Sequence, residues 1–183
     1  MKVINLLGGA GLGKSTAAAG LFYELKRRDI NAELVPEYAK ELVWEGRMDL
    51  LEDQLHILAQ QNRRLLRLKG KVDIVVTDAP LLHSIIYEPA GYPDSYVSFC
   101  LDFFNLYDNV NFVLNRTFAY RQEGRFQDEA GAIEIDRRIV SMLKEYGVPF
   151  TMVSAGSAVE EVLTHLGLGA TGPADLGAFR LAS

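Results

Sequence analysis

Nine consecutive residues near the start of the chain have the types and the spacing of a phosphate-binding loop. They fit the pattern GxxxxGK followed by Ser, between an apolar run and a stretch that favours helix. The nine are Gly8, Gly9, Ala10, Gly11, Leu12, Gly13, Lys14, Ser15 and Thr16. Glycines let such a loop turn its backbone N–H groups inward on phosphate oxygens, and the N-terminus of the following helix adds a positive dipole end. The segment is therefore expected to bind a polyphosphate anion, with ATP as the natural ligand.

The polar side chains at the end of this loop are expected to divide the work of holding a triphosphate. Lys14 would reach the β- and γ-phosphates, and the Ser15 hydroxyl would ligate Mg²⁺. The magnesium ion would offset the charge that develops on the transferred group. Thr16 would support the α-phosphate region. The loop thus predicts ATP and Mg²⁺ as cofactors.

Two carboxylates, Glu37 and Asp78, directly follow stretches that read as strands. Ligands of parallel α/β sheets bind beyond the carboxyl ends of the strands, so both are candidate site residues. Asp78 would hold Mg²⁺ or its waters, unless it serves only to shape the turn before Pro80. Glu37 would accept the proton of an attacking hydroxyl, unless it is a solvated residue at the start of a helix. Glu41 is the alternative base, and which carboxylate acts as base stays open.

A polar stretch over residues 116–131 carries three arginines, Arg116, Arg121 and Arg125. A loop of this composition after a strand can close over the phosphates, exclude water and neutralise transition-state charge. We expect a lid here, with Arg116 binding the nucleotide and Arg121 and Arg125 acting in catalysis. The alternative for each is an exposed surface arginine.

Hydrophobic periodicity predicts strands that alternate with helices. The strands are expected at 2–7, 32–35, 72–77, 110–114 and 150–153, and the helices at 14–28, 53–69, 95–107, 134–146 and 158–166. Such alternation is typical of an α/β fold with a parallel sheet. Asp53 can cap the start of the second of these helices. Because no linker divides the chain, we expect one P-loop domain over residues 1–166 and a loosely held tail over 167–183.

The composition narrows the class of protein. With 49% hydrophobic and 23% charged residues and a net charge of −5, the chain has the balance of a globular protein and no overall attraction for nucleic acid or membranes. The single cysteine, Cys100, excludes an internal disulfide, and the three histidines lack metal-ligand spacing. No targeting segment is visible, so a cytoplasmic protein is expected. The oligomeric state cannot be inferred.

Three other features could contact a substrate. The segment 62–71 holds five basic residues, but it ends a helix that leads into a strand, so it should lie opposite the phosphate site. Gln54 and Gln61 can share a helix face and could recognise a base. The remaining feature is a set of aromatic residues that could stack on a planar acceptor or could simply be core: Tyr87, Tyr92, Tyr96, Phe99 and Phe103.

Together, these features resemble the NadR-type, nicotinamide-riboside-kinase-like P-loop family, which includes bacteriophage members. Besides the phosphate loop and the arginine stretch, the resemblance is carried by Val35, Pro36, Glu37, Tyr38 and Ala39 and by Thr77, Asp78, Ala79 and Pro80. It runs from about residue 2 to residue 166 and implies strand order 2-3-1-4-5 and ATP as donor. The chain is also similar to viral kinases that phosphorylate 5-hydroxymethyluridine within DNA.

The leading hypothesis is therefore transfer of the ATP γ-phosphate to a hydroxyl of a nucleoside-type acceptor. The acceptor could be a free molecule or a hydroxymethylated base in DNA, and the sequence leaves this open. The alternative is a P-loop ATPase or nucleotide switch acting on a protein partner. No NKxD guanine-reading motif and no LSGGQ motif occur in the sequence, which argues against a GTPase and an ABC ATPase.

Overall fold

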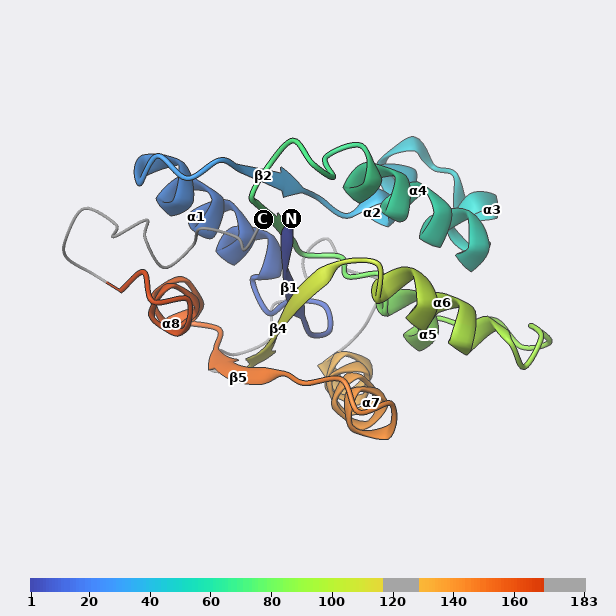
Figure 1. Ribbon diagram of the computed structural model, residues 1–183. Coiled ribbons are helices and arrows are strands. Elements are labelled where there is room, and N and C mark those ends of the chain that lie inside the picture. The colour runs from blue at the N-terminus through green and yellow to red at the C-terminus, as the bar shows by residue number, and fades with distance from the viewer. Residues whose placement is uncertain (117–128, 170–183) are drawn as a thin grey trace.

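The computed structural model describes residues 1–116 and 129–169, and within them the chain forms a parallel sheet flanked by helices (Figure 1). The strands are β1 Lys2–Leu7, β2 Ala32–Val35, β3 Ile74–Thr77, β4 Asp108–Asn115 and β5 Thr151–Ser154. Every paired strand is parallel to its neighbour, and the order is β2-β3-β1-β4-β5. The predicted α/β class and the predicted order 2-3-1-4-5 are both confirmed.

The helices form two layers on opposite faces of this sheet. They are α1 Lys14–Arg27, α2 Tyr38–Glu45, α3 Met48–Leu51, α4 Gln54–Leu66, α5 His83–Ile86, α6 Tyr96–Phe104, α7 Glu129–Glu145 and α8 Ala158–His165. Helices α1 and α8 cover one face, and α4 to α7 cover the other (Figure 1). Among the described residues, no helix is both long and apolar enough to cross a membrane.

Strand β1 occupies the centre of the sheet and is buried on both faces. Val3 and Leu7 join the core under α4, α6 and α7, whereas Ile4 and Leu6 join the core under α1 and α8. All four side chains are fully buried. A strand covered on both sides has no polar face, which explains why its sequence is almost continuously apolar.

The structure differs from the predicted elements in two short helices that were not expected, α3 and α5, and in helix α7, which begins at Glu129 rather than at residue 134. The last residues assigned to the lid, 129–131, are therefore helical. Gly131 suggested a loop, but Ala132 packs with no exposed surface, and this packing outweighs the low helix propensity of a single glycine. Arg121 and Arg125, the rest of the predicted lid and residues 170–183 of the predicted tail lie outside the described residues.

The parallel order places the site at one edge of the sheet. The loop after β1 and the segments that follow β2 and β3 all leave from the carboxyl ends of three adjacent strands. Helix α4 starts near this edge at Gln54 and runs away from it. The basic segment at 62–71 therefore precedes β3 at the opposite edge, as predicted.

Candidate active site

The phosphate loop depends on glycines at positions where the backbone turns to positive φ. Gly8, Gly11 and Gly13 have φ values of 145°, 84° and 74°. Residues with a Cβ rarely adopt these conformations, so glycine is required for the loop to fold in this form. Gly13 is the N-cap of α1 in the left-handed conformation, and Lys14 is the first helical residue. The loop therefore ends at a helix N-terminus, where backbone N–H groups and the helix dipole favour an anion.

Gly9 is needed for a different reason, which is the close approach of helix α7. A Cβ at Gly9 would lie 2.6 Å from the carbonyl oxygen of Ala132 and 2.9 Å from Oδ1 of Asp136. The Gly9 N–H instead donates a hydrogen bond of 2.6 Å to that Asp136 oxygen. Asp136, which sequence reasoning missed, thus anchors the first half of the phosphate loop.

Arg116 completes this anchor. Its Nε donates to Oδ2 of Asp136 at 2.6 Å, and its Nη2 donates to the carbonyl oxygen of Ala10 at 2.8 Å. The ion pair is largely shielded, with side-chain exposures of 16% and 21%. Arg116, predicted to bind the nucleotide, therefore lies against the phosphate loop and contacts its backbone.

The Lys14 ammonium group is surrounded by carboxylates. Its Nζ donates to the carbonyl oxygen of Gly9 at 2.7 Å. Burial lowers the pKa of Lys14, while the negative charges of Glu37, Asp78 and Asp136 act in the opposite direction. The phosphate loop and both predicted carboxylates are thus brought together around this one side chain.

Ser15 and Asp78 form a hydrogen-bonded pair of oxygen ligands of the kind that Mg²⁺ prefers. The Ser15 hydroxyl donates to Oδ2 of Asp78 at 2.5 Å. Asp78 is 4% exposed, and its Oδ1 is buried without a hydrogen-bond partner among the described residues. A buried carboxylate oxygen is costly unless something satisfies it, and Mg²⁺ prefers a few protein oxygens plus waters and phosphates. Ser15 and Asp78 therefore fit a magnesium ion, although the described residues contain no cluster of three or more His, Cys, Asp or Glu.

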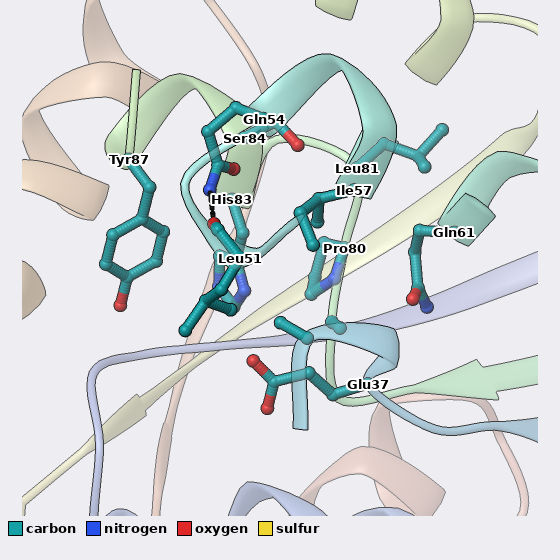
Figure 2. Close-up of a pocket in the computed structure, with 12 residues that line it drawn as sticks. Glu37, Leu51, Gln54, Ile57, Gln61, Pro80, Leu81, His83, Ser84 and Tyr87 are labelled. Carbon is teal, nitrogen blue, oxygen red and sulfur yellow. Dashed lines mark hydrogen bonds between the residues drawn. The ribbon is translucent and has the colours of Figure 1, made fainter. Parts of the chain in front are cut away.

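Glu37 lies at the N-cap position of α2, where its side chain makes no capping hydrogen bond. The carboxyl group instead lines a pocket (Figure 2). Burial raises the pKa of Glu37, the charge of Lys14 lowers it, and Asp78 raises it further. The result is a carboxyl group with a raised pKa that borders both the phosphate loop and the pocket.

The pocket has a volume of about 210 Å³ and is mainly apolar, with Leu51, Ile57 and Leu81 among its lining residues. Both predicted glutamines, Gln54 and Gln61, also line it, and the Gln54 amide donates to the carbonyl oxygen of Leu51 at 3.2 Å (Figure 2). A mainly apolar pocket with a few convergent polar groups is typical of small-molecule sites. This one lies directly beside the phosphate loop.

His83 also lines the pocket, and sequence reasoning did not assign it to the site. Burial lowers the pKa of His83 to about 3, and the positive charge of Lys14 acts in the same direction. Its Nε2 is buried without a hydrogen-bond partner among the described residues. The imidazole is therefore neutral at physiological pH and adds no charge to the pocket.

Two further sets of residues singled out in the sequence are Glu41, the alternative base, and the five aromatic residues. Glu41 pairs with Arg64 through two hydrogen bonds of 2.7 and 2.6 Å, so it is engaged on the surface side of α4. Of the aromatic set, Tyr87 lines the pocket, whereas Tyr96 is 3% exposed and belongs to the hydrophobic core. Of the five aromatic residues that could stack or belong to the core, Tyr87 alone lines the pocket.

A parallel sheet of this order, with a phosphate loop between its first strand and first helix, defines a P-loop nucleotide-binding domain. The family described as AAA domain matches residues 3–161, and the chain belongs to that family. No protein with a curated description matches the chain.

Solved structures of two kinases and of the NadR protein share this fold. The deoxyadenosine kinase of M. mycoides, solved with dCMP and dCDP, has a TM-score of 0.60 at 19% identity, covering 91% of this chain and 99% of its own. The thymidylate kinase of Ehrlichia chaffeensis has a TM-score of 0.61 at 18% identity, with 91% and 98% covered. The NadR protein in complex with NR has a TM-score of 0.67 at 19% identity, covering 94% of this chain but 54% of that one. The predicted likeness to NadR is confirmed at the level of the fold.

Proposed function

We propose that this protein is an ATP-dependent kinase that transfers the γ-phosphate to a hydroxyl of a nucleoside-type acceptor. The observation that carries the proposal is the position of Glu37, which borders the pocket on one side and the charge cluster of Lys14 and Asp78 on the other. A phosphotransferase needs a donor site and an acceptor site that share such a boundary. The kinase folds of the similar structures agree with it.

On the donor side, the backbone of the phosphate loop would bind the triphosphate, and the Lys14 ammonium would turn from the Gly9 carbonyl to the β- and γ-phosphates. Ser15 and Asp78 would hold Mg²⁺, which supplies charge neutralisation on the phosphates when bound. Asp136 and Arg116 would keep the loop in shape. Arg121 and Arg125, outside the described residues, are proposed to neutralise charge on the transferred group.

On the acceptor side, Glu37 would accept the proton of the attacking hydroxyl. The oxygen forms a bond to the γ-phosphorus, the bond from that phosphorus to the β–γ bridging oxygen breaks, and ADP leaves. A raised pKa brings Glu37 closer to the operating pH, where a general base is most effective. Asp78, paired with Ser15, is better placed for the metal than for the proton.

The pocket favours an uncharged acceptor over a nucleoside monophosphate. In the described part of the chain its wall contains no Lys or Arg, His83 is neutral, and the one charged lining residue is the carboxylate Glu37. Burying a phosphate against an acid and apolar side chains without a cation would be costly. The structures solved with NR and with deoxynucleotides show that related folds bind ligands of this size.

A hydroxymethylated base within DNA is the polymer version of the same acceptor. Such a base would have to leave the duplex to enter the pocket, as enzymes that modify bases require. A second candidate, a P-loop ATPase or switch acting on a protein partner, is favoured by the family description alone. It gives no role to the pocket beside Glu37.

The test is incubation of the purified protein with γ-labelled ATP, Mg²⁺ and a panel of acceptors. The panel contains nucleosides, their 5′-monophosphates and hydroxymethyluracil-containing DNA. We expect label on a hydroxyl of a nucleoside or of the modified base, and little on the monophosphates. Hydrolysis that needs a partner protein, with no label on any acceptor, would replace the kinase by the ATPase.

A further inference from the structure

We propose that Gln61 is a positioning residue that holds Glu37 and Asp78, the two proposed site carboxylates, in their working positions. The inference rests on the proposed function for its kinetic consequence, but its structural part stands on hydrogen bonds alone. It replaces the prediction that Gln61 recognises a base.

The side chain of Gln61 brackets Glu37. Its Oε1 accepts a hydrogen bond of 3.1 Å from the backbone N–H of Tyr38, and its Nε2 donates one of 3.3 Å to the carbonyl oxygen of Pro36. These are the residues immediately before and after Glu37. Gln61 is 4% exposed, so water competes little for these bonds.

The same amide reaches the neighbouring strand end, where Asp78 is bracketed in turn. Nε2 of Gln61 contacts Oγ1 of Thr77 at 3.5 Å, and that hydroxyl oxygen accepts a hydrogen bond of 3.2 Å from the N–H of Ala79. Thr77 is fully buried. Because Val35 and Thr77 are register partners in adjacent strands, one side chain of α4 ties together the two segments that carry the carboxylates.

This arrangement leaves Gln61 little capacity to read an acceptor. A glutamine amide has two N–H donors, and here they are directed at Pro36 and Thr77. Gln54, seven residues earlier on the same helix, lines the same pocket and donates only to the local carbonyl oxygen of Leu51 among the bonds described. Gln54 is therefore the matched control, placed to contact the acceptor but not to hold the carboxylates.

The first experiment follows the amide proton of Tyr38 by NMR hydrogen exchange in nucleotide-free protein. Tyr38 is the first residue of α2, so its N–H has no partner within the helix and donates instead to Oε1 of Gln61. We expect Gln61→Met, which keeps the volume but removes the amide, to speed exchange of Tyr38 about tenfold or more. Gln54→Met should leave it unchanged. An unchanged Tyr38 rate in Gln61→Met would overturn the bracket.

The second experiment compares kcat and KM in the same two variants, using the acceptor that the wild type labels. Misplacement of a reacting group costs on the order of 10²-fold, so Gln61→Met should lower kcat by about that factor with both KM values nearly unchanged. Gln54→Met should raise the acceptor KM and spare kcat. The reverse pattern, a raised acceptor KM in Gln61→Met with normal kcat, would show that Gln61 contacts the acceptor and would overturn the proposal.

Thr77→Val provides a check if Gln61→Met folds poorly. It removes the shared hydroxyl at almost constant volume, and we expect kcat to fall about tenfold with unchanged KM values, whereas Thr77→Ser, which keeps the hydroxyl, should restore most of the rate. A Thr77→Val enzyme with normal kcat would count against the bracket. If the wild type labels no acceptor at all, the proposed function fails, while the exchange rates of Tyr38 still decide the structural claim.

Discussion

The phosphate loop and the proposed acceptor pocket lie side by side but are built in different ways. The loop is one contiguous segment, residues 8–16, and its ligand groups are largely backbone N–H groups presented by glycines. The pocket is assembled from side chains that follow β2 and β3 and that lie on α4 and α5. A triphosphate could thus be recognised by local backbone geometry, whereas the proposed acceptor would be recognised by residues that tertiary packing brings together.

The two regions also differ in charge. The loop concentrates Lys14, Arg116, Asp78 and Asp136 within one network, while the described pocket wall has a single charged side chain, Glu37. If this comparison is correct, changes in the loop should weaken ATP use, and changes at the pocket should act on transfer. The following variants test that division, from the largest expected effect to the smallest.

Lys14→Ala should have the largest effect, because it removes the ammonium group that we propose contacts the transferred phosphate. We expect kcat to fall by about 10³-fold, with a melting temperature close to that of the wild type. Label transfer from ATP measures the rate. Lys26→Ala, at an exposed lysine in the last turn of α1, is the control and should be fully active. A Lys14→Ala enzyme with normal turnover would contradict the assigned role.

Glu37→Gln should come next and should separate the two regions. It keeps the size of the side chain but cannot accept a proton, so we expect kcat to fall by about 10²-fold or more. The ATP dissociation constant, measured by calorimetry with Mg²⁺, should hardly change. An equal loss of ATP affinity and of rate would place Glu37 in the donor site and erase the distinction.

The same variant should show a pH-dependent change in stability without any nucleotide. The pKa of Glu37 is raised above its ordinary value of 4.5 by burial, so the folded protein binds this proton more tightly than the unfolded chain. Stability is then lost as pH rises from about 4.5 through the raised pKa, because the buried group must ionise. Glu37→Gln has no such loss and should melt higher than the wild type at neutral pH. The difference in melting temperature between the two proteins should vanish at acidic pH. A difference that stays constant across the pH range would contradict a buried Glu37 carboxyl group with a raised pKa.

Asp136→Ala tests the anchor between α7 and the phosphate loop. Loss of the hydrogen bond to Gly9 and of the ion pair with Arg116 should raise the ATP dissociation constant about tenfold. The acceptor KM should not change. Glu134→Ala on the exposed side of the same helix is the control, and equal effects of the two variants would mean that the anchor plays no part in ATP binding.

Asp53→Ala should give the smallest effect on activity. Asp53 caps α4 by accepting a hydrogen bond of 3.0 Å from the N–H of His56, as its sequence position predicted. Loss of an N-cap costs about 1 kcal/mol of unfolding free energy, which urea titration can resolve. Glu52→Ala, next to it, should be neutral. Because α4 carries Gln54 and Gln61, a large change in acceptor KM would show that the pocket depends on this cap more than we expect.

Much of the site was predictable from the sequence, but the phosphate loop and the two carboxylates were found by different kinds of argument. The phosphate loop can be recognised directly from the sequence because its chemistry depends on consecutive residues. Glu37 and Asp78 could be found because carboxyl ends of parallel strands meet at one edge, and the structure does place both around Lys14. The capping role of Asp53 was found by the same kind of local rule.

Other residues carried no signal that spacing could reveal. Asp136 reaches Gly9 from 127 positions away, and only the packing of α7 against the loop brings them together. His83 showed no metal-ligand spacing, and its neutral charge state in the pocket wall follows from burial. The sequence suggested that Gln61 could recognise a base. Its hydrogen-bond partners include Pro36, which follows β2, and Thr77, which ends β3. Hydrophobic periodicity locates a helix but does not say which backbone groups its side chains will meet.

The sequence by itself determined the phosphate loop, the α/β class and the order of elements, because glycine geometry and apolar periodicity act over neighbouring residues. Tertiary structure alone decided which side chains surround that loop and which close the pocket. The reason is that strands adjacent in the sheet, such as β1 and β3, are separated by some seventy residues in the chain. Their pairing, and not their sequence, brings a lysine, two carboxylates and a glutamine to one edge.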